Sequence, residues 1–164
     1  MKLKLIKYFK EIVLTAVMIT IFANVISLYK SRDLSKTPLK QINLTLIDGT
    51  HYTFPRKKPL LIHFWATWCP ICKLEAPNIQ TIAKHYDLLT IAVKSGSDAS
   101  LEQYMNAHQL SYKIYNDNDG SLAKEYKVPA YPTTFIYNTK GELVFSEVGY
   151  TSLWGLWLRM WWAS

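Results

Sequence analysis

The sequence predicts an α/β domain in which buried strands alternate with helices and a hairpin follows near the end. Two apolar runs, LLIHFWA at residues 60–66 and LLTIAV at 88–93, have the length and composition of buried central strands. The run TTFIYNTKGELVFSEV at 133–148 reads as two strands around a turn at 138–141. Helix signals lie between these runs. The hairpin adds antiparallel strands to a layered sheet, so the sheet should be mixed.

A second hairpin and a loop are expected before the first central strand. INLTLIDGTHYTF at 42–54 alternates apolar and polar residues, turns at Asp48-Gly49 and alternates again. This pattern is typical of a β-hairpin. The basic stretch 56–59 predicts a loop that leads into the strand at 60–66.

Helices and shorter elements fill the remainder of the domain. A helix is expected from about Cys69 to Tyr86, bent at Pro77. SGSDAS at 95–100 predicts the capped start of a helix that ends at His108. The other expected elements are a short strand at 112–117, a short helix at 121–126 and a final helix at 151–161.

The final helix is rich in tryptophan. Trp154, Trp157 and Trp161 recur at spacings of three and four, which predicts that they share one helix face packed in the core. Contact with a membrane or a partner is the alternative.

The first 38 residues differ in composition from the rest and predict a targeting segment. Four lysines within residues 1–11 are followed by an uncharged stretch, 12–29. As a helix, this stretch would be about 27 Å long, close to the roughly 30 Å of a bilayer's hydrocarbon core. We therefore expect a basic cytoplasmic segment (1–11), a transmembrane anchor (12–29), a linker (30–38) and one folded domain (39–164). A signal peptide cleaved near Ser27 is the alternative.

Charge and composition disfavour nucleic-acid binding as the function. The net charge is +7, and it falls to +4 once the four lysines and the glutamate of residues 1–11 are left out. No basic residues cluster with interleaved aromatic residues on a helix, so nucleic-acid binding is not predicted.

The chain has two cysteines, Cys69 and Cys72, three positions apart at the predicted start of a helix. Unpaired backbone N–H groups and the positive end of the helix dipole favour a thiolate at Cys69. Cys72 lies one turn further on, where it can attack a disulfide formed at Cys69. A bridge across so short a loop restricts the unfolded chain little, which favours a reactive pair over a structural one. Trp68 shields the pair, and Pro70 suits the first turn because it lacks an N–H.

Metal binding is the competing interpretation of the same two thiols. A zinc site would need further ligands, and His63 and His85 are the ones near in sequence. A copper carrier with this spacing would be a much smaller domain.

The cysteine segment resembles the thioredoxin superfamily. FWATWCPIC at 64–72 is similar to its active-site signature, and VPAYPTTFIY at 128–137 is similar to its second signature. The hairpin before the core strand and CKLEAP at 72–77 narrow the resemblance to membrane-anchored thioredoxin-like proteins of bacterial envelopes. It is strongest to the suppressor-of-copper-sensitivity D type, and cytochrome c maturation reductases are a sibling group. The resemblance covers residues 39–164 and implies a thioredoxin fold, a central mixed β-sheet flanked by helices. The N-terminal β-hairpin and transmembrane helix would be extensions of that fold.

The resemblance implies roles for the two signatures. Cys69 would be the attacking nucleophile and Cys72 the resolving thiol, with their disulfide as the redox centre and no metal or other cofactor. Pro132 would be a cis-proline that faces the cysteines, and the backbone of Tyr131 would pair with a substrate strand.

Further positions around the cysteines receive roles in the same way. Trp68, Pro70 and Ile71 would contact the substrate. Glu75, three residues after the second cysteine, stands where envelope reductases keep an acid that manages protons; the alternative is an exposed helix carboxylate. His63 stands where many thioredoxins hold a buried aspartate, and it is either a proton relay to the second cysteine or a hydrogen-bonded core residue.

The implied function is that of a protein disulfide oxidoreductase in the bacterial inner membrane, with its domain in the periplasm and a reducing role in copper or oxidative stress. Its partners would be protein substrates with cysteines or disulfides and a membrane thiol protein that donates electrons. Ile71 supports the reducing direction because it adds no positive charge beside the thiolate. The alternatives are a cytochrome c maturation thiol reductase and a metal-binding or redox-inactive adaptor.

Overall fold

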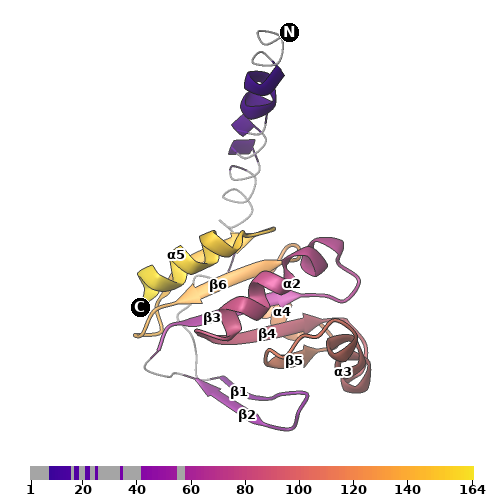
Figure 1. Cartoon of the computed structure of the whole chain (residues 1–164). Coiled ribbons are helices and arrows are strands. Elements are labelled where there is room, and N and C mark those ends of the chain that lie inside the picture. The colour runs from indigo at the N-terminus through magenta and orange to yellow at the C-terminus, as the bar shows by residue number, and fades with distance from the viewer. Residues whose placement is uncertain are drawn as a thin grey trace.

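The computed structural model describes residues 8–15, 17–18, 21–22, 25, 34, 42–54 and 58–164. Within this part of the chain, five strands form one mixed sheet in the order β5-β4-β3-β6-β7 (Figure 1). Their bounds are β3 (Leu60–Trp65), β4 (Asp87–Val93), β5 (Ile114–Asp117), β6 (Thr133–Tyr137) and β7 (Leu143–Val148). The neighbours β3, β4 and β5 are parallel, whereas β6 is antiparallel to both β3 and β7. The predicted mixed sheet is confirmed.

Strand β3 is the middle strand of the sheet, and every one of its residues is buried. Its side chains alternate between the two faces, as strand geometry requires. Leu61 and Trp65 join a core cluster with both cysteines, while Leu60, Ile62 and Phe64 belong to a second cluster on the opposite face. His63 is two positions away from both Leu61 and Trp65, so its side chain projects from the same face of the sheet, toward the cysteines.

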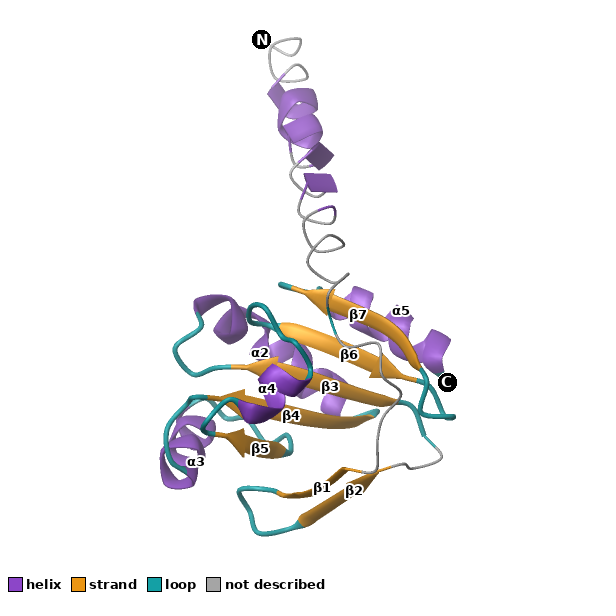
Figure 2. Ribbon diagram, turned by 180° about the vertical axis from the view of Figure 1, so that it is seen from behind, coloured by secondary structure: helices purple, strands orange, loops and turns teal. Residues whose placement is uncertain are grey.

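Helices cover both faces of the sheet. Helices α2 (Pro70–Ala83) and α5 (Leu153–Ala163) lie side by side on the cysteine face, and α4 (Ser121–Glu125) lies on the other (Figures 1 and 2). Helix α3 (Asp98–Ala107) packs Leu101 and Met105 into the cysteine-side cluster. Serine side chains cap two of these helices, Ser97 before α3 and Ser152 before α5, and each accepts a backbone N–H from the first turn.

Helix α2 ends earlier than the sequence predicts. It stops at Ala83, and the next residues form a tight turn in which the N–H of His85 donates to the carbonyl of Ile82 at 3.0 Å. After this turn the chain enters β4, which starts at Asp87. The predicted helix end at Tyr86 therefore lies three residues beyond the observed end.

The hairpin that precedes the sheet is confirmed. Strands β1 (Ile42–Thr45) and β2 (His51–Phe54) pair antiparallel, and Gly49 takes a positive φ of 78° in the turn. The N–H of Ile47 donates to the carbonyl of Ile114 at 3.1 Å, which ties the hairpin to the β5 edge of the main sheet.

The tryptophans of α5 do not share one buried face. Trp157 packs against the rings of His85 and Tyr86, at centroid distances of 5.1 and 5.3 Å. Trp154 and Trp161 are 84% and 66% exposed. The reason is that smaller or more flexible side chains take the core side of α5: Leu156, Met160 and Ala163. The predicted common core face is wrong.

The predicted inner-membrane location is contradicted. A helix that crosses a bilayer needs about 20 apolar residues. Among the residues that the structure describes, no helix is long and apolar enough to do so. The division of the first 38 residues into 1–11, 12–29 and 30–38, like the basic loop at 56–59, falls largely outside the described residues.

Candidate active site

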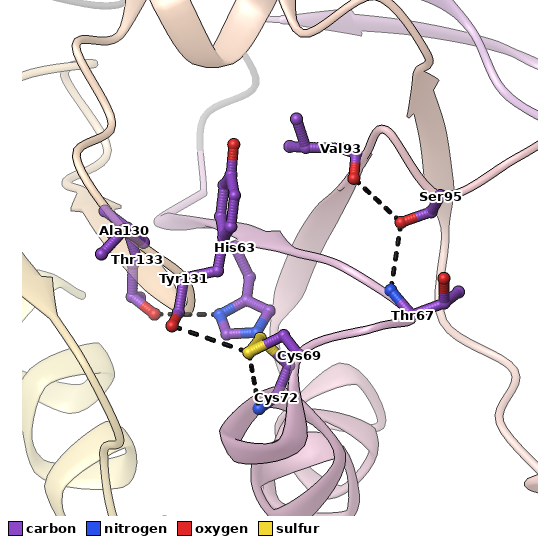
Figure 3. Close-up of a disulfide and its surroundings, with 10 residues drawn as sticks. His63, Thr67, Cys69, Cys72, Val93, Ser95, Ala130, Tyr131 and Thr133 are labelled. Atoms are coloured by element: carbon purple, nitrogen blue, oxygen red, sulfur yellow. Dashed lines mark hydrogen bonds between the residues drawn. A yellow bond between two sulfur atoms is a disulfide. The ribbon is translucent and has the colours of Figure 1, made fainter.

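Both cysteines lie at the start of α2, shortly after the end of β3. After β3 ends at Trp65, a short turn places Cys69 as the N-cap residue of α2, and Pro70 occupies the first turn. Cys69 and Cys72 form a disulfide (Figure 3), and the Sγ of Cys69 accepts the backbone N–H of Cys72 at 3.2 Å. An N–H at a helix N-terminus that points at a sulfur stabilises negative charge on it. The N-cap geometry therefore favours a thiolate at Cys69 when the pair is reduced.

The loop before β6 reaches the same sulfur from another part of the chain. The Tyr131–Pro132 peptide bond is cis. The carbonyl oxygen of Tyr131 lies 3.6 Å from the Sγ of Cys69, close enough to accept the proton of the reduced thiol (Figure 3). The carbonyl of Tyr131 thus lies beside the cysteine, although the two residues are 62 positions apart in sequence.

Exposed apolar side chains border the disulfide. Trp68 is 59% and Ile71 43% exposed, whereas Cys69 is only 5% exposed. The indole of Trp68 is fixed at two points: its Nε1–H donates to the carbonyl of Lys94 at 3.1 Å, and its ring meets Tyr131 edge to face. Together with the exposed Pro70, the side chains of Trp68 and Ile71 form an apolar rim beside the disulfide. A molecule that reaches the Cys69 sulfur must therefore pass over this rim.

The turn before Cys69 is held by the end of β4. The N–H of Thr67 donates to the Oγ of Ser95 at 3.0 Å, and the Ser95 hydroxyl donates to the carbonyl of Val93 at 2.9 Å (Figure 3). These two hydrogen bonds fix the approach of the chain to the cysteine.

His63 is buried below the cysteines on β3. Its Nδ1 lies 3.0 Å from the Oγ1 of Thr134 on β6. Burial lowers the pKa of His63 to about 3, so the imidazole is neutral at physiological pH. The sequence placed His63 near the pair, but its partner Thr134 was not foreseen.

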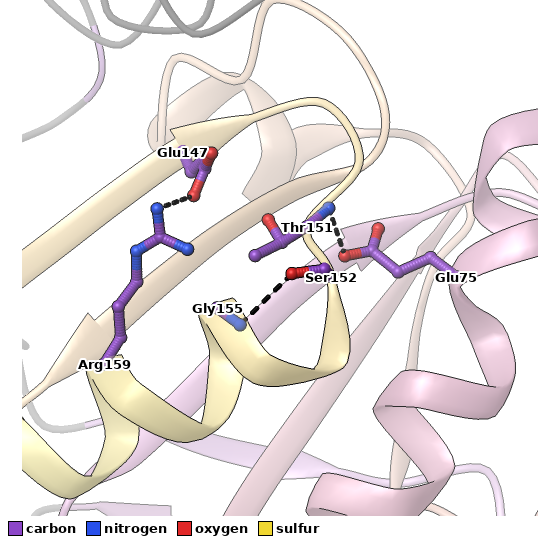
Figure 4. A network of polar contacts seen from close by, with 6 residues as sticks. All are labelled: Glu75, Glu147, Thr151, Ser152, Gly155 and Arg159. Atoms are coloured by element: carbon purple, nitrogen blue, oxygen red, sulfur yellow. Dashed lines mark hydrogen bonds and ion pairs between the residues drawn. The ribbon is translucent and has the colours of Figure 1, made fainter. Parts of the chain in front are cut away.

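Glu75 is fully buried on α2, so the alternative of an exposed helix carboxylate is wrong. One carboxyl oxygen, Oε1, accepts the backbone N–H of Thr151 at 3.0 Å (Figure 4). Oε2 is buried and has no hydrogen-bond partner among the described residues. The pKa of Glu75 is raised to about 8, mainly by burial; the Thr151 N–H opposes this rise, and the negative charge of Glu147 adds a smaller one. The side chain is therefore mostly protonated at neutral pH.

An ion pair lies at the outer end of this network. Arg159 on α5 contacts the carboxylate of Glu147 on β7 at 2.7 Å (Figure 4). Thr151, Glu147 and Arg159 were not singled out from the sequence. Each lies far from the cysteine motif along the chain. Glu147 and Arg159 stand in a strand and a helix that are mostly apolar, whereas Thr151 lies between these two elements and carries no such signal.

The metal alternative receives no support from the arrangement of ligands. In the described part of the chain, no three or more His, Cys, Asp or Glu side chains gather as a metal site. His85, one of the two histidines considered, packs against Trp157 instead.

Comparison with known proteins identifies the fold and the chemistry. Residues 37–146 match the model of the AhpC/TSA family. The structure of StoA from Bacillus subtilis superposes with a TM-score of 0.65 at 26% identity, covering 79% of this chain and all of that one. The expected thioredoxin fold, a mixed sheet flanked by helices, is thereby confirmed.

Curated relatives extend the match along the sequence. The "Thioredoxin-like protein" of Haemophilus influenzae is 29% identical over 164 residues, 98% of this chain and 95% of its own length. "Sporulation thiol-disulfide oxidoreductase A" of Bacillus subtilis is 32% identical over 111 residues, 63% of this chain and 67% of its own length. Set beside the disulfide at the start of α2, these matches show that the chain belongs to the AhpC/TSA family, as a thioredoxin-like thiol-disulfide oxidoreductase whose redox centre is Cys69–Cys72.

Proposed function

We propose that this enzyme works as a reductase of protein disulfides, with Cys69 as the attacking thiol and Cys72 as the resolving one. The thiolate of Cys69 attacks one sulfur of a client disulfide, whose bond breaks as a mixed disulfide forms, and the leaving client thiolate takes up a proton. Cys72 then loses its proton and attacks the Cys69 sulfur, which releases the second client thiol. The client gains two electrons and two protons, and the enzyme is left as the Cys69–Cys72 disulfide.

The observation that carries the assignment is the position of Cys69 as N-cap. Its sulfur accepts the Cys72 N–H at the positive end of α2, whereas Cys72 lies within the first turn of the helix. The first thiol is therefore the one whose anion the helix stabilises, and the apolar rim surrounds that thiol. We assign client contact to this rim, namely Trp68, Pro70, Ile71 and the backbone of Tyr131, beside Pro132.

Glu75 is the group we assign to proton exchange with Cys72. It lies one helical turn further along α2 and is buried like Cys72. Its raised pKa of about 8 lies near the ordinary pKa of a thiol, about 8.5, so a proton can pass between such groups at little cost in free energy. His63 is less suited, because a pKa of about 3 leaves the imidazole without a proton to release at neutral pH.

The reducing direction follows from the charges near the sulfurs. A cation beside the thiolate would stabilise the reduced form and make the disulfide a stronger oxidant. Ile71 is apolar, His63 is neutral and Glu75 supplies no positive charge. We therefore expect a potential nearer to about −270 mV, as in thioredoxin, than to about −120 mV.

The partners of this reaction are proposed from the resemblance. A membrane thiol protein would return electrons to the enzyme, and the clients would be proteins whose cysteines are oxidised under copper or oxidative stress. Apocytochrome c cysteines are the alternative clients. Identification of the trapped clients by mass spectrometry distinguishes the two classes, because apocytochrome peptides carry a CxxCH sequence.

The test of the proposal is the redox state of the pair in cells. Acid-quenched thiol trapping should find Cys69 and Cys72 mostly as free thiols when the electron donor is present and oxidised when it is deleted. A pair that is oxidised in both conditions would contradict the reducing role and indicate an oxidase or isomerase. Purified reduced enzyme should also reduce the disulfides of insulin, and a Cys69→Ser variant should not.

A further inference from the structure

An ion pair and a glycine lie beyond the Thr151–Ser152 turn that contacts the buried acid of the active site (Figure 4). Arg159 extends back along α5 toward the start of the helix and contacts Glu147 at 2.7 Å (Figure 4). A side chain at Gly155 would oppose this position, because a Cβ there would lie 3.0 Å from a terminal guanidinium nitrogen of Arg159. The absence of a side chain at 155 thus makes room for the guanidinium beside the first turn of α5.

The sheet places Glu147 on the same face as the active site. Thr134 pairs with His63 on one side and with Glu147 on the other, so the three residues form a cross-strand row. Directly opposed residues of antiparallel strands project from the same face. This row runs under α2 and α5, from the histidine below the cysteines to the ion pair at the sheet edge.

The first turn of α5 connects this ion pair to Glu75. Thr151, which donates its N–H to Glu75, immediately precedes the N-cap Ser152 of the helix that carries Arg159. The titratable or charged side chains on the elements around Glu75, besides Glu75 itself, are Cys72 and Lys73 on α2, His63 on β3, Glu147 on β7 and Arg159 on α5. Lys73 is exposed to solvent, the cysteines form a disulfide and His63 is neutral, so Glu147 and Arg159 are the two charges that remain beside the sheet.

We propose that Arg159, seated over Gly155 and paired with Glu147, is a positioning residue that sets the pH at which Glu75 releases its proton. The inference rests on the proposed function only in taking Glu75 to serve the cysteines. An unpaired Glu147 carboxylate would repel a second negative charge at Glu75, and the guanidinium cancels most of that repulsion. Arg159 and Glu147 must therefore act on Glu75 with opposite signs.

The experiment is a direct titration of the Glu75 carboxyl carbon by NMR in the full-length oxidised protein, where the cysteines do not titrate. In Arg159→Gln, the midpoint should move up by about half to one pH unit. In Glu147→Gln, it should move down by a similar amount, and in the double variant it should return close to the wild-type value. Arg159→Lys keeps the positive charge, so the midpoint of the Glu75 titration in this variant should stay close to the wild-type value.

The matched control removes the other described ion pair. Lys113 contacts Asp87 at 3.2 Å at the opposite side of the sheet, so Lys113→Gln should leave the Glu75 midpoint unchanged. Shifts of the same sign in Arg159→Gln and Glu147→Gln, or no shift in either, would overturn the inference. Because this readout does not involve the thiols, it is independent of the proposed direction of electron flow. A separate pH profile of thiol alkylation in the reduced protein tests the role of Glu75, not that of Arg159.

Discussion

The stability of the oxidised protein should depend on pH through two buried groups with opposite effects. Burial raises the pKa of Glu75 from 4.5 to about 8 and lowers the pKa of His63 from 6.5 to about 3. The other groups with shifted pKa values titrate outside this range: Asp48 and Asp119 lie below 3.8, and the affected tyrosines lie above 10. The disulfide cysteines do not titrate. Among the groups with shifted pKa values, Glu75 and His63 are the two that titrate between pH 4 and 8 in the folded or the unfolded protein.

The sign of each effect follows from proton linkage. Between pH 4.5 and 8, Glu75 holds its proton in the folded protein and loses it in the unfolded chain, so stability falls by about 1.4 kcal/mol per pH unit. Between pH 3 and 6.5, His63 is neutral when folded and charged when unfolded, so stability rises with pH at the same rate. The two slopes cancel from pH 4.5 to 6.5. Above 6.5 the decline due to Glu75 is unopposed and amounts to about 2 kcal/mol by pH 8.

Urea unfolding at a series of pH values measures this profile. The free energy of unfolding of the wild-type protein should be constant from pH 4.5 to 6.5 and should fall above pH 6.5. Glu75→Gln keeps an acceptor for the Thr151 N–H but cannot ionise, so its decline above pH 6.5 should vanish and its stability should rise from pH 4.5 to 6.5. His63→Asn should show the converse, a steady fall from pH 4.5 to 8. The slope decides the result, because a constant offset from altered packing leaves it unchanged. Parallel curves for wild type and Glu75→Gln would refute the reasoning.

Three further substitutions test the supports of the site. Asp117→Ala should reduce the free energy of unfolding by about 2 to 3 kcal/mol, measured in urea, because the buried carboxylate accepts two backbone N–H groups of α4. Trp68→Phe should leave stability within about 1 kcal/mol but lower kcat/KM for insulin reduction about fivefold, since it loses the bond to the Lys94 carbonyl beside the exposed rim. Thr134→Val should cost about 1 to 3 kcal/mol of unfolding free energy because it leaves His63 without its hydroxyl partner.

Much of the fold could be predicted from local patterns. The apolar run at 60–66 indicated the central strand, and the cysteine and proline after it indicated the start of α2. The end of α2 could not be predicted, because the tight turn at His85 is imposed by the need to enter β4, a tertiary requirement. The sequence pattern also could not predict which face of α5 is buried. A helix that is apolar nearly all round does not show which stripe meets the sheet.

The site could be predicted to the extent that it lies within the two signatures. The cysteine pair, Trp68, Pro70, Ile71 and Glu75 occupy neighbouring positions in the sequence, and Tyr131 and Pro132 lie in the second signature, so spacing and resemblance sufficed to select them. The partner of Glu75 is Thr151, 76 positions away, and its approach depends on how α5 packs beside α2. Nothing in the local sequence specifies that contact. The same holds for the Glu147–Arg159 pair, which joins a strand to a helix across the sheet edge.

The central claim is that Cys69 attacks the client and Cys72 resolves the mixed disulfide. The most direct measurement is trapping of covalent intermediates in cells that express Cys72→Ser or Cys69→Ser, with mass-spectrometric identification of the bonded cysteine. The account predicts that Cys72→Ser accumulates client proteins joined to Cys69, because no second thiol remains to release them, and that Cys69→Ser accumulates few. Accumulation of clients on Cys72 in the Cys69→Ser variant, with none on Cys69 in the other, would contradict it.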